Sequence, residues 1–209
     1  MPIDLYCERT DAAFWSEPVN AVSNAAFLVA AVMAFLLWRR RADRDWPALA
    51  LIGATVLVGL GSFAFHTLAT RRAMLLDVVP IAAFIYGYLA LALRRFLRLP
   101  LVQAGAVLAG FAAGSWALGC LLPPGFLKGS GSYLPALAAM VVVGGILRGT
   151  ATGQAILAAA AVFAVSLVFR TIDQAVCPTA PVGTHAGWHL LNAAVLYLLL
   201  RAAIRHGHR

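Results

Sequence analysis

Seven apolar segments follow one another along the chain, and each is close to the length that a bilayer requires. They run over residues 20–38, 46–68, 74–93, 101–122, 132–147, 153–170 and 185–204. A helix needs about 20 apolar residues to cross the hydrocarbon core of a membrane. Short stretches rich in Arg, Gly or Pro separate the segments, as is typical of turns between helices. The pattern predicts an all-α, polytopic membrane protein, a bundle of seven transmembrane helices.

Composition supports this fold class. Hydrophobic residues make up 62% of the chain and charged residues only 11%, whereas about 25% of the residues of a soluble domain are charged. Seven spans use nearly all of the 209 residues, so we expect a single transmembrane domain over 1–209, with residues 1–18 as an outer cap. That cap has no basic region ahead of an apolar run, so we do not expect a cleaved signal peptide.

The basic residues predict an orientation and argue against a nucleic-acid partner. The net charge is +8, but the basic residues stand in short groups at the ends of the predicted helices, where a membrane explains them. If the N-terminus lies outside, eleven of the 16 Lys and Arg fall on the inner side and five on the outer side. Because positive charge favours the cytoplasmic side, we expect an outer N-terminus and a cytoplasmic C-terminus. Compact loops and heavy use of Ala and Arg suggest a bacterial inner membrane.

The hairpin between the second and third spans carries the first candidate chemistry. Ser62 and His66 are four residues apart near the end of one helix and therefore share a face. Asp77 follows near the start of the next helix. Ionisable groups at membrane depth usually face the bundle interior and a partner, which favours a shared site. In the alternative, His66 reaches toward the lipid headgroups and Asp77 caps its helix; this hairpin alone leaves that open.

A second pair of histidines stands at the outer end of the last span. His185 and His189 are also four residues apart, and such a pair can hold one metal ion. The alternative is a pair of interfacial histidines beside Trp188. The predicted orientation places His66 on the same side of the membrane as this pair. Three histidines with a fourth position open for water or substrate form a catalytic zinc arrangement, so together the two motifs predict a zinc site.

The N-terminal segment is rich in acids. Asp4, Glu8, Asp11 and Glu17 are half of the eight acids in the chain. Carboxylate and carbonyl oxygens on a short loop could hold calcium. A solvated acidic surface explains the same residues, and the residues alone favour that simpler reading.

The three cysteines differ in their predicted positions. Cys7 and Cys177 fall on outer segments, where oxidising conditions permit a disulfide, although two free thiols remain possible. Cys120 lies within the fourth span, where we expect a packed thiol.

Three short blocks of the sequence resemble the alkaline ceramidase family, which consists of seven-helix membrane amidases. YCER followed by EPVNAVSN resembles its N-terminal motif, GSFAFH with LLD resembles its Ser-x-x-x-His and Leu-Asp motif, and IDQAVC with HAGWH resembles its Ile-Asp-x-x-x-Cys and His-Ala-x-Trp-His motifs. The N-terminal block departs from the family pattern at Leu5 and Thr10.

The resemblance implies a role for each matching residue. It makes His66, His185 and His189 the ligands of Zn²⁺, with Asp77 and Ser62 as catalytic residues beside the metal. It also makes Cys7 and Cys177 a disulfide, and it places Tyr6, Glu8 and Glu17 in a Ca²⁺ site.

The function that the resemblance implies is zinc-dependent hydrolysis of the amide of a ceramide-like lipid, which releases a fatty acid and a sphingoid base. In this hypothesis Asp77 is the general base, and Ser62 either stabilises the oxyanion or orients Asp77. One alternative is a zinc-dependent hydrolase of another acyl lipid. The other is a metal-binding receptor or transporter bundle without catalysis, which the concentration of polar residues on one side disfavours.

Overall fold

The fold is a bundle of seven membrane-length helical segments. The computed structural model describes residues 3–206, and over these residues all regular secondary structure is helical. Seven segments are long and apolar enough to cross a membrane, which confirms the predicted fold class. The elements are α1 (Pro18–Ser23), α2 (Ala25–Trp38), α3 (Trp46–Leu68), α4 (Arg71–Leu91), η1 (Ala92–Phe96), α5 (Leu101–Leu121), η2 (Phe126–Tyr133), α6 (Leu134–Ile146), α7 (Ala151–Val176) and α8 (His185–His206).

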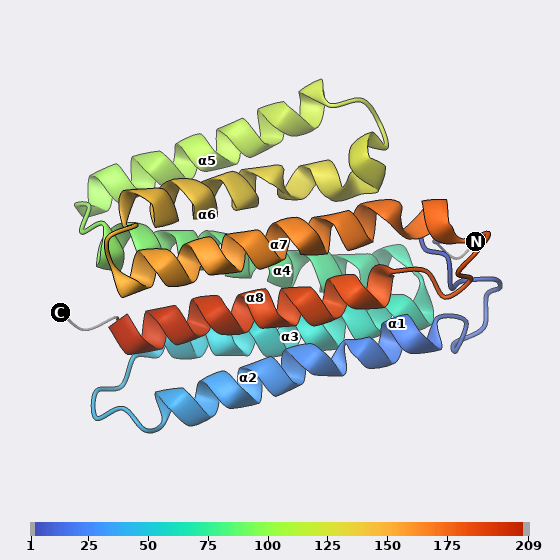
Figure 1. Cartoon of the computed structure of the whole chain (residues 1–209), viewed down its shortest axis with the longest axis horizontal. Coiled ribbons are helices and arrows are strands. Elements are labelled where there is room, and N and C mark those ends of the chain that lie inside the picture. The colour runs from blue at the N-terminus through green and yellow to red at the C-terminus, as the bar shows by residue number, and fades with distance from the viewer. Residues whose placement is uncertain (1–2, 207–209) are drawn as a thin grey trace.

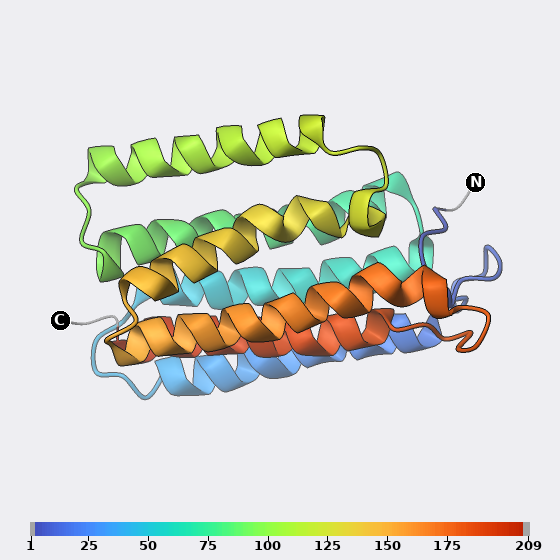
Figure 2. The same ribbon diagram turned by 45° about the horizontal axis from the view of Figure 1, so that its top comes forward.

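The helices pack unevenly. The most extensive contacts join α3 to α4 and α7 to α8, and the described chain begins and ends at opposite ends of the bundle (Figure 1), as an odd number of crossings requires. α5 lies at one edge (Figure 2), where Ala104 is its one buried residue. Cys120 is a free cysteine, but because it lies on this edge helix its side chain is exposed rather than packed as predicted.

Several predicted spans differ from the structure by a few residues at their ends, and two of the differences bear on the site. The first span is interrupted at Asn24, which separates α1 from α2. The sixth span continues to Val176, past the predicted end at residue 170. Its extra turns contain Asp173, which is buried and accepts hydrogen bonds from backbone amides of other segments. Because the protein supplies these partners, the helix can continue past the predicted end with a buried carboxylate within it.

Two glycines allow helices to approach closely at the end of the bundle that carries the N-terminal segment. A Cβ atom at Gly61 of α3 would collide with the backbone carbonyl of Leu76 on α4. A Cβ atom at Gly187 of α8 would collide with the ring of Phe169 on α7. Small residues at such contacts are the usual means by which membrane helices pack closely. The residues beside these glycines, Ser62 and the α8 histidines among them, are thereby brought against the neighbouring helices.

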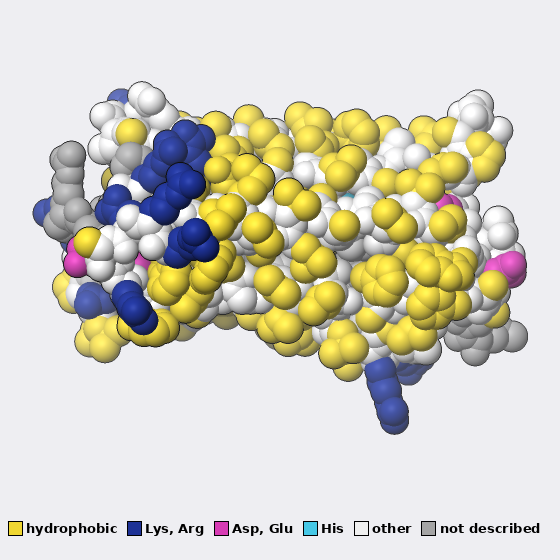
Figure 3. Space-filling view, turned by 90° about the horizontal axis from the view of Figure 1, so that it is seen from below, with side chains coloured by type: hydrophobic (Ala, Val, Ile, Leu, Met, Phe, Trp, Pro, Cys, Tyr) yellow, Lys and Arg dark blue, Asp and Glu magenta, His cyan; other side chains and the backbone are white. Residues whose placement is uncertain are grey.

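The surface has an apolar band with basic residues concentrated at one end. Most of the Lys and Arg side chains visible in Figure 3 gather at the end of the bundle where α8 finishes, and hydrophobic side chains cover the middle. At that end Asp45 caps α3, accepting a hydrogen bond from the Ala48 amide at 3.1 Å, and pairs with Arg95 at 2.6 Å. The distribution of charge is that of a helical bundle spanning a bilayer.

Candidate metal centre

The structure brings the three predicted histidines together inside the bundle. His66 comes from the last turn of α3, and His185 and His189 from the first two turns of α8. Each is at most 2% exposed, and their potential ligand atoms all lie within 4.8 Å of one another. Three imidazoles converging at this separation can serve as ligands to one metal ion.

The hydrogen bonds of these histidines leave ring nitrogens available for a metal. Nδ1 of His66 lies 2.6 Å from Oε2 of Glu17, and Nδ1 of His189 lies 2.7 Å from Oγ of Ser23. Nε2 of His66 and Nδ1 of His185 are buried without a hydrogen-bond partner. Buried polar atoms normally have partners, and a metal-binding histidine typically uses its second nitrogen to bond a carboxylate or other oxygen. The residues therefore fit a zinc ion.

Behind His66 lies a buried ion pair that the sequence did not reveal. Nε of Arg9 lies 2.5 Å from Oε1 of Glu17, and Nη2 of Arg9 donates to the backbone carbonyl of His66 at 2.8 Å. Burial raises the pKa of the Glu17 carboxyl, but its hydrogen bonds from His66, Arg9 and Asn20 outweigh burial and hold that pKa below its ordinary value. An ionised Glu17 can accept the His66 Nδ1–H, which directs Nε2 toward the other histidines.

The three residues predicted to bind calcium have separate partners. The Glu8 carboxylate accepts hydrogen bonds from the amides of Val19 (2.7 Å) and Asn20 (2.8 Å), so it caps the first turn of α1. The Glu17 carboxylate bonds to Arg9, Asn20 and His66. The Tyr6 ring stacks on His185, with the centroids 3.6 Å apart. Among the described His, Cys, Asp and Glu residues, the three histidines are the one group of three or more that could hold a metal ion, so the calcium site stays a prediction.

Asp77 and Ser62 lie on the same cavity as His185 and His189. Both line the pocket onto which His185 and His189 open. Oδ1 of Asp77 is buried without a hydrogen-bond partner, and the Ser62 hydroxyl lies within hydrogen-bonding reach of this carboxylate. A carboxylate with a free oxygen beside a group of imidazoles is suited to accept and return a proton.

The predicted disulfide is present, and Asp173 beside it links the N-terminal segment to the start of α8. Cys7 and Cys177 are bridged with a Cα–Cα distance of 5.4 Å. Asp173 accepts hydrogen bonds from the amides of Cys7 (2.9 Å), Thr184 (2.7 Å) and His185 (2.9 Å). This buried carboxylate therefore fixes both the N-terminal segment and the start of α8. Its role could not be predicted from the sequence motifs, although it stands in the IDQAVC block.

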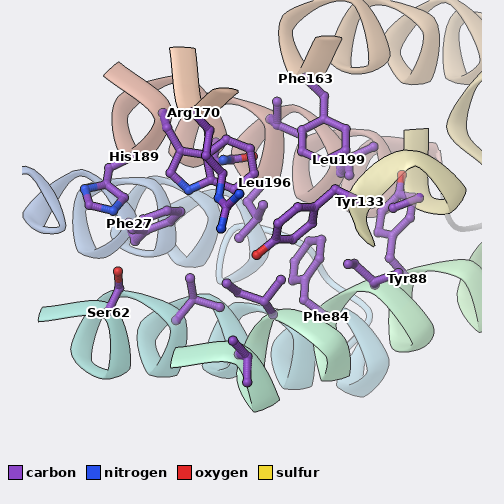
Figure 4. A pocket seen from close by; sticks show the side chains of 18 of the residues that line it. Phe27, Ser62, Phe84, Tyr88, Tyr133, Phe163, Arg170, His189, Leu196 and Leu199 are labelled. Carbon is purple, nitrogen blue, oxygen red and sulfur yellow. The ribbon is translucent and has the colours of Figure 1, made fainter. Parts of the chain in front are cut away.

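A largely apolar pocket extends from the histidines into the bundle. Its cavity volume is about 170 Å³. Ser62 and His189 lie at one end and Tyr88 at the other, with Phe84, Leu196 and other hydrophobic side chains between them (Figure 4). Such a cavity suits a ligand with a long apolar part and one polar end.

The arrangement thus combines three potential metal ligands, a free carboxylate and an apolar cavity. In comparisons with known proteins, no family model matches the chain and no curated protein matches it.

Proposed function

We propose that the chain is a zinc-dependent amidase of membrane lipids that cleaves ceramide-like substrates into a fatty acid and a sphingoid base. One observation carries the proposal: three buried imidazoles converge, and two of them, His185 and His189, line a pocket together with Asp77 and Ser62. The resemblance of the three sequence blocks to alkaline ceramidases supplies the reaction and the substrate. The apolar lining of the pocket supports a lipid rather than a water-soluble amide.

Zinc held by His66, His185 and His189 would supply Lewis-acid chemistry, polarising the carbonyl and making hydroxide available near neutral pH. The Glu17 carboxylate keeps His66 in the tautomer with Nε2 free for the metal. Ser23 holds His189 in the same way, through Nδ1.

The protein's own groups account for the proton transfers. Asp77 accepts a proton from the water that attacks the amide carbonyl carbon. When the C–N bond breaks, Asp77 returns that proton to the amine nitrogen, so a carboxylic acid and an amine leave. Ser62 donates a hydrogen bond, either to the oxyanion or to Asp77. The acyl chain lies in the apolar pocket that extends toward Tyr88.

The proposal is tested by measuring metal content and ceramide turnover in the same purified samples. The wild-type chain is expected to carry close to one zinc per chain and to lose turnover when a chelator removes it. His185→Ala is expected to lose both zinc and turnover. Asp77→Asn is expected to retain zinc while turnover falls at least about 100-fold, the effect of losing a general base.

Asp43→Asn is the matched control for Asp77→Asn, because Asp43 is an exposed acid on the loop before α3. It should retain both zinc and turnover. Full activity in Asp77→Asn would contradict the assignment of the base. Metal-dependent flux into proteoliposomes without lipid turnover would instead support a transporter.

A further inference from the structure

Arg170 is a basic residue of the pocket that the proposed reaction does not use. It lies on α7 and lines the same cavity as Asp77, His185 and His189. Figure 4 shows its side chain reaching into the pocket between His189 and Tyr133. The contacts between α7 and α8 fix its depth, because Thr184 donates to the Phe169 carbonyl and Ser166 to the Trp188 carbonyl. Arg170 is therefore level with the first turn of α8, which presents the histidines.

The guanidinium of Arg170 is held in place before any ligand binds. Nη1 donates to the Lys128 carbonyl at 3.1 Å and to Oγ of Ser130 at 3.2 Å, so the η2 segment fixes one edge of the group. Its central carbon lies 5.4 Å from the ring centroid of Tyr133 and 5.6 Å from that of Trp188. A guanidinium fixed in this way loses little conformational freedom when it binds a further group.

No carboxylate of the described chain forms an ion pair with this cation. The three salt bridges involve Arg9, His66 and Arg95, and none involves Arg170. Asp77 is the only acid among the described residues that line the pocket. A cation within the membrane-spanning part of a protein is costly unless a counter-charge accompanies it. With zinc bound, the cavity would carry still more positive charge, so an anionic ligand is favoured.

We propose that Arg170 binds an anionic group on the amine side of the scissile amide, so that the preferred substrates are acidic N-acyl lipids. The anion can be a phosphate, a sulfonate or a carboxylate, all of which accept hydrogen bonds from a guanidinium. The lipid lies with its anion at Arg170, its amide beside the histidines, and its acyl chain along the apolar wall toward Tyr88. This proposal rests on the proposed amidase function for the reaction but on the charge balance of the pocket for the substrate class.

The test compares matched substrates in nanodiscs of neutral phosphatidylcholine. The wild-type chain and Arg170→Gln are assayed on ceramide, on ceramide 1-phosphate and on an N-acyl amino acid of the same acyl length. We expect the wild-type chain to prefer at least one acidic substrate to ceramide. In Arg170→Gln, kcat/KM for that substrate should fall about 10- to 100-fold, the range for losing a charge-assisted hydrogen bond, with less than a threefold change for ceramide. The two acidic substrates show whether phosphate or carboxylate is the better ligand.

Arg72→Gln is the matched control, since Arg72 is an exposed arginine at the start of α4 that does not line the pocket. It should leave all three activities unchanged. An equal loss on neutral and acidic substrates in Arg170→Gln, or a wild-type preference for ceramide, would overturn the assignment.

A binding measurement separates this proposal from the amidase function. Dodecyl phosphate and dodecanol are titrated into the zinc-loaded protein, and neither compound has an amide to cleave. The wild-type chain should bind dodecyl phosphate at least about tenfold more tightly than dodecanol, and Arg170→Gln should lose that difference. Absence of turnover on every lipid would contradict the proposed amidase function. Equal binding of the two compounds by the wild-type chain would contradict the proposed role of Arg170.

Discussion

At the residue scale, the arginine that lies behind the candidate metal centre is as informative as the three histidines. Arg9 is 5% exposed and bonds both to Glu17 and to the backbone of His66. It therefore holds the carboxylate that in turn holds His66, one of the proposed metal ligands. Removing such an outer partner of a ligand typically costs 10- to 100-fold in metal affinity.

We therefore predict that Arg9→Gln raises the dissociation constant for zinc about 10- to 100-fold, with a smaller rise in Arg9→Lys, which keeps the charge. Competition with a fluorescent chelator measures the constant, and Arg72→Gln serves as the control. The thermal transition is recorded in parallel to identify variants that fail to fold. A folded Arg9→Gln with wild-type zinc affinity would contradict this role.

The ion pair between Arg9 and Glu17 also bears on whether the N-terminal segment binds calcium. Glu17 already faces a permanent cation, and Glu8 caps α1 through two backbone amides. Neither carboxylate has to bind a metal ion to satisfy its hydrogen-bonding capacity. Added calcium should therefore leave the zinc affinity of the wild-type chain unchanged, and a rise of more than about threefold would show that a calcium site forms.

At the element scale, the close contact between α3 and α4 determines the position of Ser62 relative to Asp77. Gly61 lies directly against the Leu76 carbonyl, so an added methyl group must push the helices apart one residue away from both side chains. We predict that Gly61→Ala lowers turnover at least about tenfold and destabilises the fold by about 1–3 kcal/mol, the usual cost of overpacking.

Gly53→Ala is the matched control for this substitution. Gly53 lies on the same helix, and a Cβ atom there has no neighbour within 4 Å. Turnover and thermal denaturation in detergent are measured on both variants. Equal behaviour of the two would show that the α3–α4 contact does not control the site.

The helices and the clustering of the three histidines were more predictable from sequence than the residues that support them. Segment length and hydropathy determine the spans, because a bilayer imposes both. The spacing of His185 and His189 places them on one helical face wherever α8 lies. Arg9 donates to the backbone of His66, and Arg170 donates to Lys128 and Ser130. These contacts join segments distant in sequence, so local pattern cannot distinguish either residue from an arginine at the membrane interface. The extension of α7 to Val176 likewise depends on the partners of Asp173, which lie on other segments.

At the scale of the whole molecule, the site lies at the opposite end of the bundle from most of the visible basic residues. The histidines, the disulfide and the N-terminal segment share one end, and most of the Lys and Arg side chains visible in Figure 3 gather at the other. Because positive charge favours the cytoplasmic side, we propose that the metal centre opens toward the outer face. An oxidised Cys7–Cys177 bridge agrees with this orientation, since disulfides persist outside the reducing cytoplasm.

Cysteine labelling in intact cells tests the orientation. In a Cys120→Ser background, which removes the free thiol, Ala12→Cys places a thiol in the exposed N-terminal segment and Gly149→Cys places one in the exposed α6–α7 turn. A membrane-impermeant maleimide should label the first variant in intact cells and the second only after permeabilisation. The reverse pattern would place the histidines on the cytoplasmic side, where lipid substrate would have to come from the inner leaflet and the disulfide would be exposed to reductants.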